Sequence, residues 1–331
     1  MKLAPLQQGL SLIEMMISMA IGSVVILGVL SLFTANTQTY NALQAQTRLQ
    51  EGANFGLNVI ARDLQRAGYR GCYSRGDVYS TVEPIPAAFD IRFGLSVHNG
   101  LSGRTWTASS TDLESDVSDG AIVGTDIITL RFVENDEAYL STVLVTGVED
   151  VQVTVGSGAA SNIAANDLAL ISDCEKATLF KVTSVDTNDA IMTLGHAVSP
   201  ASGNVVAGLA ETGTFGTDAA VASIVSKTYF IKAGVSGLSG RGGYSLHQFD
   251  GTSTSELVEG VEDLQILLGI DTDSDGVPNQ YLDPSASIDT LKIVTILVEI
   301  TANSISDAGA READGLLRRT FRQTLQIRNP G

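Results

Sequence analysis

Apolar residues form one long run near the N-terminus. From Leu10 to Phe33 the chain carries a single charge, Glu14. As a helix, these 24 residues span roughly 36 Å at about 1.5 Å per residue, which exceeds the roughly 30 Å hydrocarbon core of a bilayer. The run therefore predicts a membrane-spanning helix. An unpaired carboxylate costs about 2.5–3.5 kcal/mol at the bilayer centre, so we expect Glu14 to have a partner elsewhere.

The helical pattern continues beyond the apolar run with a narrower apolar stripe. Its members recur at spacings of four and three, which is typical of a helix with one buried face: Ala53, Leu57, Ile60, Leu64 and Ala67. No proline lies between Leu6 and Glu83, and Gly68 and Gly71 are end signals. The pattern predicts one helix over about residues 10–67, apolar all round at first and then packed on its own domain.

From about residue 76 the hydrophobic period changes to two, with β-branched residues in short runs bounded by Gly, Asp, Asn and Ser. The predicted strands are Ile127–Val133, Thr142–Val145, Val151–Val155, Leu168–Ile171, Thr178–Val185, Lys227–Ala233, Tyr244–Phe249, Leu264–Ile270, Leu291–Ile300 and Thr320–Ile327. The last alternates polar and apolar residues, which predicts a half-exposed strand. Gly156–Asn166 and Ser199–Ala222 are interpreted as surface loops or weak strands, where a domain boundary is allowed but not required.

Charge separates the N-terminal region from the remainder of the chain. The net charge is −17, yet residues 1–75 hold six Lys or Arg and only three Asp or Glu, so the excess acid lies downstream. An acidic surface repels phosphates, and no Lys/Arg cluster interleaved with aromatics follows. We therefore expect a soluble, acidic head that binds no nucleic acid by itself. The 44% apolar content is sufficient for a core.

The residues around Gly9 form a motif. Gln7-Gln8-Gly9-Leu10-Ser11-Leu12-Ile13-Glu14 resembles the processing site of type IV prepilins. The resemblance implies that a membrane prepilin peptidase cuts between Gly9 and Leu10 and that the new amino group of Leu10 is methylated. It also implies that the Glu14 carboxylate pairs with the N-terminal amine of a neighbouring subunit.

The same resemblance divides the chain into four parts. Residues 1–9 are a leader peptide, residues 10–33 the transmembrane and filament-core half of the helix, residues 34–70 its amphipathic half, and residues 71–331 the head. Before assembly the chain is expected to span the inner membrane once, with the head in the periplasm. After assembly it is expected in the pilus, at the cell surface.

A secretory signal peptide and a simple single-pass anchor are the other interpretations of this segment. A signal peptide needs a basic n-region, an apolar stretch of about 7–15 residues and a small-x-small cleavage site. Lys2 is the only basic residue before the run, the run is longer, and no Ala-x-Ala site stands close after Phe33. The length and the flanks favour the prepilin interpretation.

Four motifs further along narrow the resemblance to PilW-type minor pilins: Arg62–Tyr69, Ser172–Ala177, Leu257–Leu264 and Arg318–Arg322. This resemblance implies an α+β, pilin-like fold, with a long N-terminal helix packed on antiparallel sheet and a large β-rich head. It implies a low-abundance subunit that helps initiate type IV pilus assembly, at the fibre tip. The implied partners are other minor and major pilins and the inner-membrane assembly platform.

Two rival functions remain open. A type II secretion minor pseudopilin uses the same N-terminal chemistry, and a secretion assay separates it from a pilus subunit. A membrane-anchored adhesin or ligand-binding module predicts that the head binds a surface while deletion leaves pilus number unchanged.

Cys72 and Cys174 are the only cysteines in the chain. The implied topology places both in an oxidising compartment, where such a pair is expected to form a disulfide. The bond would close a loop of roughly a hundred residues and contribute about 4–5 kcal/mol in the chain-entropy model. Two separate buried thiols are the alternative, because sequence alone does not bring the Cα atoms together.

The segment Asp271-Thr272-Asp273-Ser274-Asp275-Gly276 is a candidate calcium loop. Alternating carboxylates before a glycine aim several oxygens at one hard cation, and Asn279 and Asp283 offer further ligands. Leu282 stands where an EF-hand needs its bidentate glutamate, so the loop is not an EF-hand. A solvated acidic turn, or pairing with Arg or Lys, is the alternative.

Enzymatic motifs are not found in the sequence. The three histidines, His98, His196 and His247, are far apart, and the chain has neither His-Glu-x-x-His nor Gly-x-Ser-x-Gly. Gly237–Gly243 lacks the Lys-Ser/Thr of a phosphate-binding loop and is interpreted as a turn. We expect a protein that acts by assembly and not by catalysis.

Overall fold

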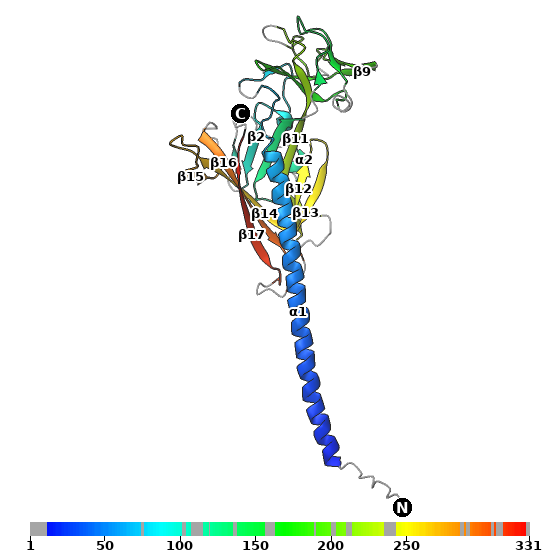
Figure 1. Cartoon of the computed structure of the whole chain (residues 1–331), viewed down its shortest axis with the longest axis vertical. Helices are drawn as coiled ribbons and strands as arrows, with labels where there is room; N and C mark the ends of the chain where they lie inside the picture. The colour runs from blue at the N-terminus through cyan, green and yellow to red at the C-terminus, as the bar shows by residue number, and fades with distance from the viewer. Residues whose placement is uncertain are drawn as a thin grey trace, which may run out of the picture.

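The computed structural model describes residues 12–73, 76–100, 104–106, 115–118, 120–134, 138–155, 163–188, 190–199, 203–209, 214–234, 243–284, 288, 292–305, 308 and 314–328. One long helix, α1 (Leu12–Leu64), projects from a β-rich head (Figure 1). The α+β, pilin-like class expected from the resemblance is confirmed.

The predicted end of the helix is close to the observed one. After Leu64 the chain tightens, because Ala67 N–H donates to the Leu64 carbonyl and Tyr69 N–H to the Arg66 carbonyl. Gly68 then adopts φ +74°, a left-handed conformation that favours glycine at a helix C-terminus. Residues 10 and 11 of the predicted helix lie outside the described residues.

The first half of the head contains short strands: β1 (Tyr79–Ser80), β2 (Leu95–Asn99), β3 (Arg104–Trp106), β4 (Ile127–Val133), β5 (Ala138–Tyr139), β6 (Val151–Thr154), β7 (Leu168–Ser172), β8 (Ala177–Lys181), β9 (Ser184–Asn188) and β10 (Ile191–Gly195). The second half contains strands that are mostly longer, with β15 as a short exception: β11 (Ala220–Ala233), β12 (Tyr244–Phe249), β13 (Thr254–Glu259), β14 (Val261–Ile270), β15 (Gln280–Leu282), β16 (Ile293–Asn303) and β17 (Arg318–Gln326). A 3-10 turn, η1 (Ala87–Phe89), and a short helix, α2 (Ser115–Ser118), complete the described elements.

Within the described residues the strands form three sheets. The largest follows the order β1-β8-β7-β11-β4-β2-β3, with β5, β12 and β13 attached through β11 and β12. A second sheet has the order β6-β10-β9, and a third has the order β15-β14-β16-β17. All the strand pairs are antiparallel except β1 with β8.

The C-terminal part of α1 lies against the base of the head, where it contacts β13, β16 and β17. All members of the predicted stripe are buried, with Ile60 and Leu64 fully so. All of them except Ala53 join one core with residues of both adjoining sheets, including Leu246, Val258 and Ile300. Ala53 packs in a smaller cluster with Leu49 and Ala302. The prediction that the second half of the helix packs on its own head is confirmed.

A separate core fills the outer lobe of the head, farthest from the helix (Figure 1). Its members come from β5 to β8, β10, β11 and the connecting segments, and include Val153, Phe180, Leu194 and Phe215. The 14-residue strand β11 runs from this lobe into the sheet behind α1. Because β11 begins at Ala220, the loop expected over Ser199–Ala222 ends inside a strand.

Most predicted strands are present, and β4 and β12 have the predicted bounds. Two predictions are wrong. Thr142–Val145 is not a strand, since only Leu144 forms a bridge there, to Phe215. Thr178–Val185 is split into β8 and β9, which belong to different sheets. In β17, partly or fully buried residues alternate with exposed ones from Thr320 to Gln326, as predicted.

Candidate functional site

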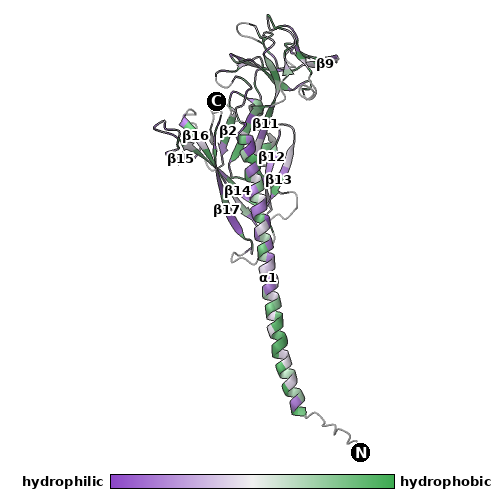
Figure 2. Ribbon diagram, in the orientation of Figure 1, coloured by the Kyte–Doolittle hydropathy of each residue, from purple (hydrophilic) through white to green (hydrophobic). Residues whose placement is uncertain are grey.

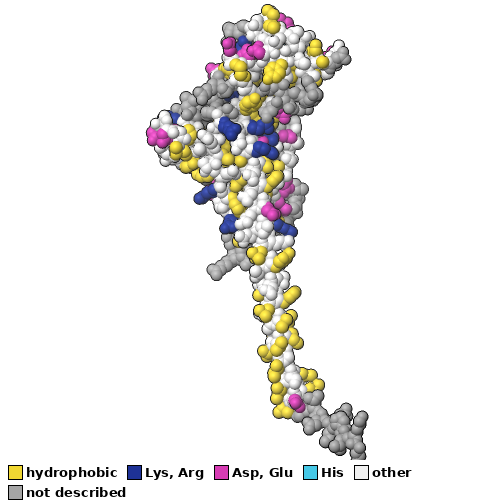
Figure 3. All heavy atoms as spheres, viewed as in Figure 1, with side chains coloured by type: hydrophobic (Ala, Val, Ile, Leu, Met, Phe, Trp, Pro, Cys, Tyr) yellow, Lys and Arg dark blue, Asp and Glu magenta, His cyan; other side chains and the backbone are white. Residues whose placement is uncertain are grey.

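The apolar side chains in the projecting half of α1 are exposed. The first buried residue of the helix is Ala45, and large apolar residues such as Leu12, Ile17 and Phe33 are more than half exposed. By length and composition this helix can cross a membrane. Hydrophobic residues predominate in the lower, free part of the helix, whereas hydrophilic residues are interspersed from its middle up to the head (Figures 2 and 3).

Glu14 lies in the first turns of this projecting helix, and its side chain is exposed. Ser18 Oγ donates to the Glu14 backbone carbonyl at 2.7 Å. This hydrogen bond does not involve the side-chain carboxylate. Gly9 and Leu10, the predicted cleavage site, lie outside the described residues. Their processing stays a prediction.

The other end of α1 is fixed to the head by a buried carboxylate, Asp63. The Lys227 ammonium on β11 donates to Asp63 Oδ2 at 2.9 Å, and the Tyr229 hydroxyl donates to the same oxygen. Asp63 is fully buried, whereas Lys227 keeps 22% of its side chain exposed. Burial, together with the bond to Asp63, raises the pKa of Tyr229, which therefore stays protonated and acts as a donor.

Arg66 extends this contact by one helical turn. Its guanidinium lies 4.2 Å from the centre of the Phe132 ring on β4, a cation–π contact. One residue beyond the apolar stripe, Gly68 N–H donates to the Arg131 carbonyl at 2.8 Å. This anchoring cluster was not predicted from the sequence. Its one indication there is the position of Asp63, an acid beside the apolar stripe of the helix.

The Cys72–Cys174 disulfide is present and spans 102 residues. Cys72 follows the end of α1, and Cys174 lies in the turn between β7 and β8. Next to the bond, Ser172 Oγ donates to the Arg70 carbonyl at 3.3 Å. The expected covalent link between the helix end and the sheet is confirmed.

The fold brings the four downstream motifs together in two pairs. The first pair, Arg62–Tyr69 and Ser172–Ala177, is brought together by contacts just after the first motif: Arg70 accepts a hydrogen bond from Ser172, and Cys72 is bonded to Cys174. The second pair, Leu257–Leu264 and Arg318–Arg322, is joined by Arg318, which donates to both oxygens of Glu262 at 2.7 and 2.9 Å. Arg318 also binds Asp314, which lowers the pKa of that carboxyl to about 2.

The candidate calcium loop brings three of its five predicted ligands together. Carboxylate oxygens of Asp271, Asp273 and Asp275 lie within 4.8 Å of one another. Asn279 Oδ1 instead accepts hydrogen bonds from Thr272, and Asp283 is not a member of the cluster. No ion pair to the three aspartates is present among the described residues, so the alternative of pairing with Arg or Lys is not favoured.

Backbone donors offset part of the charge in this loop. The Asp271 carboxylate accepts N–H groups from Gly276, Ser274 and Asp273 at 2.7, 2.6 and 3.1 Å. These bonds, that from Gly276 above all, lower the pKa of Asp271. The turn itself therefore relieves part of the repulsion among the three carboxylates that a cation would otherwise offset. Calcium binding stays a prediction.

Two histidines have structural partners. His196 and His247 are each 4% exposed; His196 Nε2 bonds the Glu149 carbonyl at 2.9 Å and His247 Nδ1 the Ser245 carbonyl at 3.1 Å. Burial lowers the pKa of His247, which favours its neutral form. Both belong to the packing of the head.

Comparison with known families identifies two segments of the chain. Residues 228–315 match the type IV pilus-assembly protein W family, and residues 5–30 match the prokaryotic N-terminal methylation motif. The comparison with curated proteins found no match. The first segment runs from the second half of β11 through β16; it includes the predicted motif at 257–264 and ends before the one at 318–322. These two families indicate a structural pilin, and the long helix and the β-rich head agree with this similarity to PilW-like minor pilins of the prepilin type.

Proposed function

We propose that the protein is processed between Gly9 and Leu10 by a prepilin peptidase, methylated on Leu10, and inserted into a type IV pilus as an assembly-initiating minor subunit. The observation that carries this proposal is the division of α1. Its first buried residue is Ala45, so more than half of a 53-residue helix has no cover from its own head. Such a surface needs lipid or neighbouring helices around it.

The exposed half of α1 is suited to both environments. In the inner membrane it spans the bilayer once, with the head in the periplasm; in the filament, packed side chains of neighbouring helices replace the lipid. The Glu14 carboxylate then pairs with the methylated amine of an adjacent subunit. This pairing removes the cost of a lone charge from the helix bundle.

The head is proposed to contribute to a tip complex with other minor pilins. Its rigid attachment to α1 supports this role, because the Asp63 contacts and the disulfide hold the helix end in a fixed orientation to the sheets. A subunit that starts a filament must present its helix and its head in one geometry. The acidic surface of the head then faces outward.

The proposal is tested on protein purified from membranes, by N-terminal sequencing and intact-mass measurement. The expected mature chain begins at methylated Leu10. Deletion of the gene is expected to reduce the number of pili, and complementation with the full chain restores it. A different mature N-terminus, or unchanged pilus number in the deletion strain, would contradict the proposal; loss of secretion with intact pili would favour a pseudopilin.

A further inference from the structure

A cavity of about 480 Å³ lies where the outer lobe meets the base of the head. Its walls come from distant parts of the chain: the segment after β1, η1, the β7–β8 hairpin, β11 and the turn between β12 and β13. Its volume is in the range of small-molecule sites. None of the groups assigned above to assembly lines it.

The pairing of β11 explains why a cavity forms there. On one edge of this strand, β7 pairs as far as Ser223, and β12 pairs only from Thr228 onward. Among the described strands none continues this edge over residues 224–227, while β4 covers the opposite edge. The gap between the two neighbouring strands is the cavity, and Ile224 and Val225 line it.

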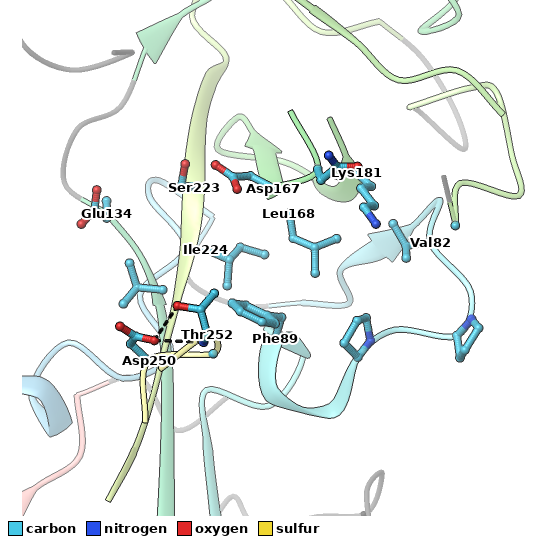
Figure 4. A pocket seen from close by; sticks show the side chains of 16 residues that line it. Val82, Phe89, Glu134, Asp167, Leu168, Lys181, Ser223, Ile224, Asp250 and Thr252 are labelled. Atoms are coloured by element: carbon cyan, nitrogen blue, oxygen red, sulfur yellow. Dashed lines mark hydrogen bonds between the residues drawn. The ribbon is translucent and has the colours of Figure 1, made fainter. Parts of the chain in front are cut away.

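The centre of the cavity is apolar. Phe89, Leu168 and Ile224 converge there, with Val82 at one side (Figure 4). Pro84 and Pro86 also line the wall. Such a surface accommodates an alkyl or aromatic group of a ligand.

The charged groups around this apolar centre are mostly acidic. Glu134, Asp167 and Asp250 carry carboxylates, against the single ammonium of Lys181 (Figure 4). Asp250 is engaged by its own turn, since Thr252 and Ser253 donate to it. Asp167 accepts a hydrogen bond from Ala164 N–H at 2.8 Å. The carboxylate of Glu134 forms no hydrogen bond or ion pair with any described residue.

A second polar group without a partner lies beside them. Ser223 Oγ is buried and has no hydrogen-bond partner within the described part of the chain. It points to the same side of the cavity as Asp167 (Figure 4). A buried hydroxyl without a partner is destabilising, and a ligand that supplies the missing donor or acceptor relieves this cost.

From these observations we propose that the cavity binds a cation carried on an apolar stem. The stem occupies the centre formed by Phe89, Leu168 and Ile224, and the ammonium or guanidinium group binds Glu134, with Asp167 and Ser223 nearby. The two sources with this chemistry are a Lys or Arg side chain of a neighbouring pilus subunit and a free alkyl- or arylamine. Binding here is independent of Glu14 and of N-terminal processing, so it goes beyond the assembly role proposed above.

The test uses full-length protein in detergent with two probes of the same shape, 4-phenylbutylamine and 4-phenylbutyrate, measured by calorimetry. The amine is expected to bind at least about tenfold more tightly, the factor that 1.4 kcal/mol represents. Glu134→Gln is expected to abolish this preference, whereas Glu175→Gln, an exposed site outside the cavity, keeps it. Equal binding of the two probes, binding of neither, or an unchanged preference in Glu134→Gln would overturn the proposal.

Two further measurements distinguish the sources of the cation. A photo-crosslinker placed at Thr252 in cells captures the neighbouring subunit if its side chain occupies the cavity. Native mass spectrometry of the purified chain detects a retained small amine if the ligand is free. Either result supports the proposal, and the absence of both shows that the cavity is empty in the cell and overturns it.

Discussion

Asp63 of α1 and Lys227 of β11 form an ion pair, with 2.9 Å between Oδ2 and Nζ, across a sequence separation of 164 residues. Asp63 has 1% of its side chain exposed, so it needs partners inside the head. Lys227 and Tyr229 provide them from one strand. The pair fixes which part of the helix faces β11.

Loss of the Asp63 carboxylate should destabilise the head. Asp63→Ala leaves Lys227 and Tyr229 without their common acceptor, and breaking a buried pair costs about 3–5 kcal/mol. Because Lys227 is partly exposed, we expect about 3 kcal/mol, measured by urea unfolding of the full chain in detergent. Asp186→Asn, at an exposed position of β9, is the control. Equal unfolding midpoints for the two variants would show that the pair is not stabilising.

Removal of the disulfide should destabilise the folded head by about 4–5 kcal/mol, because the bond closes a loop of about a hundred residues in the unfolded chain. Cys72→Ser/Cys174→Ser is compared with the parent protein under oxidising and reducing conditions. Reduction is expected to lower the melting temperature of the parent and to leave the double variant unchanged. If the melting temperature of the parent protein stayed the same although the reductant had cleaved the disulfide completely, this prediction would be contradicted.

Because of Asp126, the free energy of unfolding should decrease as pH rises. Its carboxylate is 1% exposed and accepts N–H groups from Gly100 and Ile266; burial raises its pKa from 3.8 to about 6. The folded state therefore holds a proton that the unfolded state releases between these pH values. The stabilisation is complete below pH 4 and is lost as pH rises through 6, by up to about 3 kcal/mol.

Asp126→Asn isolates this effect, since the amide does not titrate. The free energy of unfolding of the parent minus that of the variant is expected to fall between pH 4 and pH 7. Other carboxylates titrate equally in both proteins and cancel from the difference. A difference that stays constant over this range would rule out a raised pKa for Asp126.

Glu14→Ala should leave processing intact and impair incorporation. In the proposed order of events, cleavage precedes pairing with a neighbouring subunit. The variant is therefore expected to have the mass of a processed chain with alanine at position 14, while its recovery in sheared pili falls severalfold. Glu51→Ala, an exposed acid in the second half of α1, is the matched control. Normal recovery of the Glu14 variant would remove this carboxylate from the assembly mechanism.

Calcium should stabilise the loop that contains Asp271, Asp273 and Asp275. A cation bound only by the folded state raises the melting temperature in a concentration-dependent way. We expect a higher melting temperature in millimolar Ca²⁺ than in chelator, and no difference for Asp273→Asn/Asp275→Asn. Identical melts of the parent protein with and without Ca²⁺ would leave Asp271 as a turn residue capped by backbone N–H groups.

The sequence predicted α1 and its buried stripe because helical period, absence of proline and terminal glycine all agree there. It also predicted β4 and β12 with their observed bounds, because turn residues stand close to both ends of each strand. Short strands such as β1, β3 and β5 were missed, because two or three residues carry no measurable period. The division of Thr178–Val185 was missed because the sequence does not reveal that the chain changes sheets at Val182–Thr183.

The candidate site was predicted in part. The Glu14 motif and the cysteine pair are local or compositional signals, so they could be found in the sequence. The Asp63–Lys227 contact and the cavity at β11 depend on which strands become neighbours. Glu134, Ser223 and Phe89 lie far apart in the sequence, and no spacing rule brings them together.

The continuous strand β11 has a mechanical consequence. It is hydrogen-bonded within the outer lobe at Ala220–Ser223 and, four residues further along, carries Lys227 against the end of α1. A force applied to the outer lobe is therefore transmitted along the backbone of one strand to the end of α1 that is fixed in the head. The two lobes therefore respond to load together, and strain in the outer lobe reaches the end of α1 that is anchored in the head.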